Sequence, residues 1–214
     1  MIKVVLCDDH AMVRRGIRDT LSEAVDIQVT GESGSYSEVR EVLRNVACDV
    51  LILDLNLPGR GGLEVLATLR EGGSTVRVLI VSMFAEDQYA IRCLRAGAHG
   101  YLNKAGDPAE LIAAVRTIAQ GRKYVTAAVS DMLVNNLSEP TSETLHSTLS
   151  ERELQTLLKI ASGKKLSEIA EELMLSPKTV SVYRARLLEK LKLSNNAELP
   201  STPSATNWFN QKYQ

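Results

Sequence analysis

The sequence predicts an α/β protein in two parts, a five-stranded doubly wound parallel sheet followed by a small all-α domain. Over about the first 120 residues, short β-branched runs alternate with stretches whose apolar residues recur every three or four positions, the pattern of repeated βα units. The run 50–53 is apolar on both faces of a strand, which is typical of a parallel sheet covered by helices on each side. Beyond Leu149 only the helical periodicity remains.

The elements of the first part follow from these patterns in chain order. The expected strands are 3–7, 27–30, 50–53, 78–81 and 100–102. The helices between them are indicated by apolar side chains at helical spacing, namely Val13, Ile17 and Leu21; Val39, Val42, Leu43 and Val46; Leu63, Leu66 and Leu69; Tyr89, Ile91 and Leu94; and Leu111, Ile112, Val115 and Ile118. We expect residues 1–120 to form this domain.

After Gly121 the periodicity fades, and breakers and polar residues replace apolar ones, so residues 121–148 are expected to be a linker. Residues 149–199 are expected to form the second domain, and 200–214 an atypical tail rich in proline and polar residues.

Three short helices are expected in the second domain. The first begins with Ser150 and Glu153 at the spacing of a capping box and ends at Gly163. The second is indicated by Leu166, Ile169, Ala170 and Leu173 at helical spacing. The third begins at Ser176, an N-cap residue followed by proline at the first helical position, and runs to about Leu191.

Composition and charge narrow the class of protein. The 214 residues are 44% hydrophobic and 24% charged, which is ordinary for a globular protein. No apolar run approaches the ~18 residues of a membrane span, so we expect a cytoplasmic protein without a membrane partner. The three cysteines are odd in number and set among apolar residues, which indicates reduced core thiols. The net charge of -1 combines an acidic first part with a basic end, and a basic end favours an anionic partner.

Polar side chains follow four of the expected core strands. Asp8 and Asp9 follow the first, Asp54 the third, Ser82 the fourth and Lys104 the fifth. The carboxyl ends of parallel strands share one edge of a sheet, so these groups should converge. Like charges repel by about 4 kcal/mol per pair at 4 Å with an effective dielectric near 20, so the site needs a cation. Hard oxygen ligands suit Mg²⁺.

The alternative for these acids is that they are solvated loop residues or helix caps. For a single aspartate that interpretation is the better one, but four strand ends with polar groups at one edge favour a site. A carboxylate beside Mg²⁺ can attack phosphorus, with Lys104 and Ser82 binding the oxygens of the transferred group, and the product is an aspartyl phosphate.

These residues resemble a known family. Residues 1–120 resemble the flavodoxin-like receiver domain of two-component response regulators. The motifs that carry this resemblance are Asp8-Asp9, Leu53-Asp54, Leu57-Pro58-Gly59, Ser82, Tyr101 and Lys104. The resemblance implies that a histidine kinase phosphorylates Asp54. It also implies that Mg²⁺ is bound by Asp8, Asp9, Asp54 and the main-chain carbonyl of Asn56.

The resemblance assigns three further residues to signalling. Ser82 and Lys104 would contact the phosphoryl oxygens, and Tyr101 would be the aromatic switch that turns inward when Ser82 moves. Many receivers have proline directly after the lysine, whereas this chain has Ala105, so a trans peptide bond is expected there. The three histidines, His10, His99 and His146, show no metal-ligand spacing and are expected to be structural or solvated.

The last predicted helix carries the basic charge. With Val180 as the zero of a helical wheel, Tyr183, Leu187 and Leu191 form the buried stripe. The other faces combine small, apolar and basic residues, which suits a DNA major groove better than a merely solvated face. The candidate DNA-binding residues are Lys178, Thr179, Ser181, Val182, Arg184, Ala185, Arg186 and Lys190.

The second domain resembles the LuxR-type helix-turn-helix domain, through Leu149 to Glu153, Ala170, Leu173, Ser176 to Val180 and Leu191. A receiver followed by such a domain is the arrangement of NarL/FixJ-class response regulators. The resemblance implies a positioning helix over 167–174 and a recognition helix over 176–190. The family continues into a fourth helix that helps to pair two DNA-binding domains, and the 200–214 tail departs from that pattern.

The function expected from both resemblances is a transcriptional regulator, not an enzyme, that is phosphorylated by a histidine kinase, forms a homodimer on phosphorylation and binds double-stranded promoter DNA. One alternative is an aspartate-phosphate hydrolase of the haloacid-dehalogenase type, although that type has an Asp-x-Asp motif at its first strand. Another is a receiver-like interaction protein that is never phosphorylated.

Overall fold

The computed structural model describes residues 1–138 and 149–196. The chain divides into two compact units, Met1–Asn136 and Leu137–Gln214, which are described separately here. Within the described ranges, no helix has both the length and the apolar character that crossing a membrane requires.

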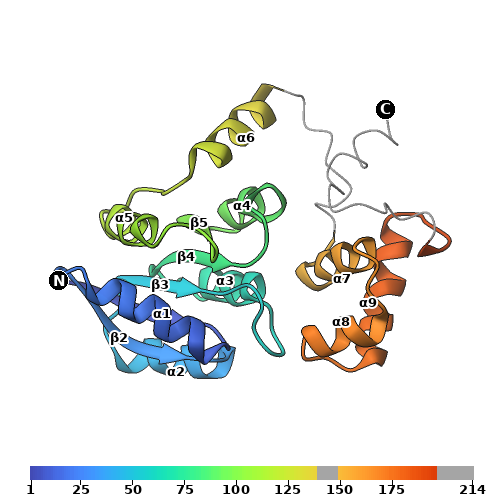
Figure 1. Ribbon diagram of the computed structural model, residues 1–214, viewed down its shortest axis with the longest axis horizontal. Helices are drawn as coiled ribbons and strands as arrows, with labels where there is room; N and C mark the ends of the chain where they lie inside the picture. Colours follow the sequence, from blue (N-terminus) through green and yellow to red (C-terminus); the bar gives the residue numbers. More distant parts are fainter. Residues whose placement is uncertain (139–148, 197–214) are drawn as a thin grey trace. The chain divides into compact units, whose positions relative to one another are not determined.

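The first unit is built on a five-stranded sheet in the order β2-β1-β3-β4-β5, and all its strand pairs are parallel (Figure 1). The predicted fold class is therefore confirmed. The strands are β1 Ile2–Cys7, β2 Ile27–Ser33, β3 Val50–Leu53, β4 Arg77–Ser82 and β5 Gly100–Asn103.

Five helices connect and cover the strands. Helices α1 and α5 pack together on one face of the sheet, and α2, α3 and α4 cover the other (Figure 1). Their bounds are α1 Ala11–Ser22, α2 Tyr36–Asn45, α3 Gly62–Glu71, α4 Glu86–Arg95 and α5 Pro108–Ala119. Every residue of β3 is buried, as its two-sided apolar pattern predicts.

The core beneath α1 and α5 fixes the positions of the strand ends. Alternate residues of β1, β3 and β4, such as Val4, Ile52 and Leu79, pack there against Leu21 of α1 and Val115 of α5. Because successive strand residues point to opposite faces, this packing sets the register of each strand and so the place at which its last residue emerges.

Strand β2 is longer than predicted. The sequence predicts an end at residue 30, but Gly31, Glu32 and Ser33 continue the strand, paired with Val5, Leu6 and Cys7 of β1. Glycine and polar residues are poor strand formers, and tertiary pairing overrides that propensity here.

The predicted linker also differs from the structure in its first half. Helix α6, Ala127–Ser138, lies within it, and Tyr124 forms a parallel bridge to Gly100 of β5. The side chain of Val129 is buried, and the Thr126 Oγ1 accepts from the Val129 N–H at 3.3 Å, which caps the helix. Seven of its twelve residues are apolar, but Asn135, Asn136 and Ser138 indicate a break, so the sequence pattern does not reveal this helix. The domain boundaries at 120 and 148 stay predictions.

The second unit contains three helices in the described range, α7 Glu151–Ala161, α8 Leu166–Glu172 and α9 Pro177–Lys190. The capping box is confirmed, because the Ser150 hydroxyl accepts from the Glu153 N–H and the Glu153 carboxylate accepts from the Ser150 N–H. Gly163 has a φ of 83° after α7, which is the left-handed geometry of a helix terminator.

Helix α8 is shorter than predicted, since it ends at Glu172 rather than at residue 174. Met174 adopts a φ of 52°, a left-handed conformation in which the α-helix cannot continue. A small core forms between α8 and α9 from Ile169, Ala170, Leu173 and Val180. The predicted tail, 200–214, lies outside the described residues.

Candidate functional site

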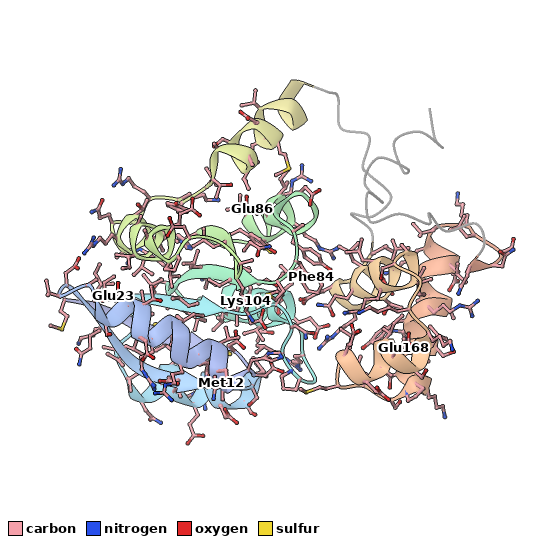
Figure 2. The ribbon with its side chains drawn as sticks, in the orientation of Figure 1. Met12, Glu23, Phe84, Glu86, Lys104 and Glu168 are labelled. Carbon is pink, nitrogen blue, oxygen red and sulfur yellow. The ribbon has the colours of Figure 1, made fainter. Side chains whose placement is uncertain are left out.

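The strand ends of the first unit bring four chemistry-bearing residues together. Backbone hydrogen bonds fix this edge: the Asp54 N–H donates to the Cys7 carbonyl at 2.8 Å, and the Lys104 N–H donates to the Ser82 carbonyl at 2.8 Å. Asp54 therefore lies beside the end of β1, and Lys104 beside the end of β4. Figure 2 marks Lys104 at this edge of the sheet, with Phe84 in the loop after β4.

Lys104 links two carboxylates. Its Nζ lies 2.6 Å from Asp8 Oδ2 and 2.9 Å from Asp54 Oδ2. The three side chains are at most 7% exposed, so this is a buried ion cluster with two negative charges and one positive charge. The predicted convergence of Asp8, Asp54 and Lys104 is confirmed by these distances.

The electrostatics of the cluster oppose the ionised state of Asp54. Burial raises the pKa of Asp54, and the Lys104 ammonium offsets only part of that rise. For Lys104, burial lowers the pKa, but attraction to Asp54 and Asp8 outweighs it, so the pKa is raised and the amine stays protonated. The ionised form of Asp54 is therefore unfavourable in this pocket unless further positive charge is supplied.

The side chains of Asp9 and His10 lie at the edge of this cluster. Asp9 is half-buried, and the Nδ1 of His10 lies 2.7 Å from its Oδ1. Ligand atoms of Asp8, Asp9, His10 and Asp54 all lie within 4.8 Å of one another. His10 was expected to be structural or solvated; its side chain is 53% exposed yet belongs to this cluster. Asn56 is half-buried two residues beyond Asp54.

The cluster fits a hard divalent cation. Within the described residues, the Asp8 Oδ2, the Asp9 Oδ1 and both carboxylate oxygens of Asp54 are buried and lack a partner with hydrogen-bond geometry, although Lys104 and His10 lie within ion-pair distance of three of these oxygens. Buried polar atoms without hydrogen bonds are costly, and converging carboxylate oxygens are the ligands that Mg²⁺ prefers. The donor set therefore suits Mg²⁺.

The residues predicted to respond to phosphorylation lie next to this pocket. Ser82 is fully buried at the end of β4, and its Oγ accepts from the Phe84 N–H at 3.4 Å. Tyr101 is 1% exposed, so its ring already points inward, and its hydroxyl donates to the Phe84 carbonyl at 2.8 Å. Asn103 Nδ2 donates to the same carbonyl at 3.1 Å. Ser82 and Tyr101 therefore both hold the loop after β4.

The loop after β3 also approaches the pocket closely. Gly62 begins α3, and a Cβ atom there would lie 2.2 Å from the main-chain oxygen of Asp54. Only glycine allows this approach, which turns the chain back over the end of β3. The peptide bond between Lys104 and Ala105 is trans, as expected.

The candidate DNA-binding helix, α9, presents the expected faces. Val180, Leu187 and Leu191 are buried as predicted, Leu188 is also buried, and Tyr183 is half-buried. The exposed candidates are Lys178, Ser181, Val182, Ala185, Arg186 and Lys190, whereas Thr179 and Arg184 are half-buried. Val182 is 43% exposed, which is unusual for a valine on a solvated helix face.

Three of the candidates on α9 have intramolecular partners. The Thr179 N–H donates to the Ser176 Oγ at 3.1 Å, the Arg184 Nε donates to the Asn196 Oδ1 at 2.6 Å, and the Lys190 Nζ lies 2.7 Å from the Glu153 Oε2. Arg184 is thus held by the chain after α9, and Lys190 by the start of α7.

Sequence reasoning missed three residues of the first unit that make long-range contacts. The Arg14 Nη1 of α1 donates to the main-chain carbonyl of Asp8, and the Thr126 Oγ1 donates to the Glu86 Oε2 at 2.5 Å. Figure 2 marks Glu86 at the start of α4. Arg14 and Arg18 are four residues apart and both face Glu32, a pairing that the sequence does not reveal. Nothing in the sequence pairs residue 86 with residue 126.

The chain is similar to known proteins over nearly its whole length. Residues 4–116 match the family "Response regulator receiver domain", and 147–201 match "Bacterial regulatory proteins, luxR family". Response regulator UvrY of Escherichia coli strain K12 is 37% identical over 200 residues, which cover 93% of this chain and 92% of UvrY.

Solved structures agree. A LuxR-family two-component response regulator from Aurantimonas is 31% identical with a TM-score of 0.59, covering 64% of this chain and 98% of that one. Salmonella RcsB, solved on promoter DNA, is 24% identical with a TM-score of 0.63 over 96% of this chain and 98% of its own, which shows a shared fold. This chain belongs to the two-component response regulators of the NarL/FixJ class, with a receiver domain and a LuxR-type helix-turn-helix domain.

Proposed function

We propose that this protein is a transcriptional regulator whose DNA binding is switched on by phosphorylation of Asp54. The observation that carries this proposal is the buried cluster of Asp54, Asp8 and Lys104, in which Asp54 lies at the end of the central strand and the Lys104 ammonium lies within ion-pair distance of both carboxylates. Asp54 has the position of a nucleophile, and Lys104 has that of a cation ready for a phosphoryl oxygen.

Asp8, Asp9, Asp54 and the main-chain carbonyl of Asn56 would hold Mg²⁺, which supplies positive charge for the phosphoryl oxygens. In the transfer, an Asp54 carboxylate oxygen forms the new bond to phosphorus. The bond from phosphorus to the phosphohistidine nitrogen of the kinase breaks, and that nitrogen keeps the electron pair. Lys104 then leaves its carboxylate partners to bind a phosphoryl oxygen.

Ser82 would pass this event to the rest of the receiver. If the Ser82 side chain rotates to donate to a phosphoryl oxygen, its Oγ moves away from the Phe84 N–H and the hydrogen bond between them is lost. That loss frees the loop after β4, whose Phe84 carbonyl is held by Tyr101 and Asn103. The buried Tyr101 is bonded to this loop, so its side chain moves when the loop moves. In this way Tyr101 would act as the switch.

DNA is the partner proposed for the second domain. Between residues 176 and 192 the chain has five Lys and Arg against one Glu. The exposed part of this charge lies beside Val182 and Ala185, a combination suited to thymine methyl groups and phosphates. One such domain offers few base contacts, so we propose that a phosphorylated homodimer places two α9 helices on half-sites about 10 bp apart.

Sedimentation velocity tests this switch. The full chain, with and without acetyl phosphate and Mg²⁺, should shift from monomer to dimer on phosphorylation, and its affinity for a promoter fragment selected from genomic DNA should rise in parallel. The Asp54→Asn variant should show neither change. A wild-type protein that takes up phosphate but keeps its sedimentation coefficient and DNA affinity would reject the proposed switch.

A further inference from the structure

We propose that Arg14 is a positioning residue for the Mg²⁺ site, acting through the main chain of Asp8. This inference rests on the proposed function of the acidic pocket. Its starting observation is that the Arg14 Nη1 on α1 donates to the carbonyl oxygen of Asp8, six residues earlier.

Four groups hold Asp8, and they act on different atoms. The His10 N–H donates to Oδ1 at 2.8 Å, and the Lys104 Nζ lies 2.6 Å from Oδ2. The Asp8 N–H donates to the Ser33 carbonyl at 3.1 Å, and Arg14 binds the Asp8 carbonyl. The first two contacts occupy carboxylate oxygens that a cation also needs, whereas the last two hold only the main chain.

Arg14 therefore fixes the turn between β1 and α1 without using a metal ligand. A cation site binds well when its ligands are already in place, because ordering them on binding costs free energy. The turn carries both Asp8 and Asp9, so one hydrogen bond to its backbone orients two of the predicted ligands.

The surroundings of Arg14 keep it in place. Its side chain is 20% exposed, and its Nε lies 3.6 Å from the Glu32 Oε2 of β2. A Cβ atom on Gly34 would lie 3.6 Å from the Arg14 Nη1, so the guanidinium packs closely against the chain after β2. Glu32 also offsets the positive charge of Arg14, which by itself would repel a cation.

Charge and position thus make opposite predictions for the loss of Arg14. If Arg14 acted only through its charge, Arg14→Gln would tighten Mg²⁺ binding, since it removes a repelling cation. If Arg14 holds the turn, the same variant weakens Mg²⁺ binding. We expect about tenfold weaker binding, the lower end of the range for residues that orient metal ligands.

The matched control is Arg18→Gln. Arg18 lies one turn further along α1, and its Nη1 donates to the same Glu32 at 2.8 Å. The variant removes the same charge from the same helix, but the contact with Asp8 stays. Arg14→Lys is the second variant, because it keeps the charge and one donor group and should restore most of the binding.

The experiment measures Mg²⁺ binding to the full chain by isothermal titration calorimetry and, separately, the initial rate of phosphorylation by acetyl phosphate over a range of Mg²⁺ concentrations. Arg14→Gln should raise the dissociation constant and the half-saturating Mg²⁺ concentration about tenfold and leave the rate at saturating Mg²⁺ nearly unchanged. Arg18→Gln should match the wild type.

Three results would overturn the inference: equal Mg²⁺ binding by Arg14→Gln and wild type, tighter binding by Arg14→Gln, or equal weakening by Arg18→Gln. A wild-type chain that binds no Mg²⁺ and accepts no phosphate would instead reject the proposed function. The two failures are therefore distinguishable. Far-ultraviolet circular dichroism of each variant checks that the weakened binding is not loss of the fold.

Discussion

At the scale of single residues, Asp54 shows a conflict between stability and function. Its pKa is raised by burial, so the folded chain binds its proton more tightly than the unfolded chain does. Ionisation of this carboxylate in the folded chain costs folding free energy, which the Lys104 ammonium offsets only in part and the neighbouring Asp8 increases. A residue of the same shape without the charge avoids this cost.

The Asp54→Asn variant should therefore be more stable than the wild type at pH 7 in EDTA. Because the raised pKa belongs to the folded state, the stability that Asp54 contributes falls as pH rises from the unfolded value of 3.8 through the folded value. The gap between variant and wild type should widen over that range and then stay constant. Each kcal/mol of the gap corresponds to about 3 °C in the thermal midpoint.

Thermal unfolding of both proteins between pH 4 and 7.5 checks this prediction. Asp19→Asn is the control, since Asp19 is a largely exposed acid on α1 whose loss should leave the midpoint nearly unchanged. Added Mg²⁺ should reverse the order by stabilising the wild type more than Asp54→Asn. A variant less stable than the wild type in EDTA across the whole range would contradict the raised pKa.

Single residues also show how far the sequence predicts the site. Asp8, Asp54, Ser82 and Lys104 were predictable because each directly follows or ends a strand, and strand ends of a parallel sheet meet at one edge. The contact of Arg14 with a main-chain carbonyl carries no residue-type signature. It depends on the angle between α1 and β1, which only the packed fold defines.

At the scale of elements, α6 is the part that composition concealed. It is tied to the receiver by three contacts: the Tyr124 N–H donates to the His99 carbonyl at 2.8 Å, the Thr126 Oγ1 bonds to Glu86, and Val129 is buried. Glu86 begins α4, directly after the loop held by Ser82 and Tyr101. Long-range contacts of this kind stabilise a helix whose local sequence contains breakers, and local patterns do not predict them.

Glu86→Ala should loosen the start of α6. Loss of the bond to Thr126 should speed hydrogen exchange of the Tyr124 and Val129 amides about five- to tenfold, corresponding to about 1 to 1.4 kcal/mol, which is the range of an ordinary hydrogen bond. Native-state exchange measured by NMR checks this. Asp87→Ala is the matched control, because Asp87 is also acidic and in the first turn of α4. Equal acceleration in both variants would show that the Glu86 contact does not hold α6.

In α9, the exposed arginine should matter more for DNA than for folding. Arg186→Ala should weaken binding to a random-sequence duplex and lower the slope of log affinity against log salt by about one, because one phosphate contact is lost. Arg95→Ala on α4 removes the same charge from the receiver and is the control. A salt titration by fluorescence anisotropy measures both. Unchanged affinity and slope for Arg186→Ala would reject α9 as the DNA-binding surface.

At the scale of the whole molecule, the first unit holds the acidic pocket proposed to accept the phosphoryl group, and the second unit holds the basic helix. Both fold classes were predictable because hydrophobic periodicity differs sharply between βα units and short helices. Because the pocket and the basic helix belong to different units, the proposed function depends on one condition. Phosphate must enter at Asp54 of the first unit for DNA binding by the second to change.

Intact-mass spectrometry of the full chain after incubation with acetyl phosphate tests that claim most directly, with peptide mapping to locate the modified residue. We expect a single phosphoryl group to be added to the wild type at Asp54, and none to be added when EDTA removes Mg²⁺ or when Asp54 is replaced by Asn. Phosphate that adds equally well to Asp54→Asn, or without Mg²⁺, would contradict it.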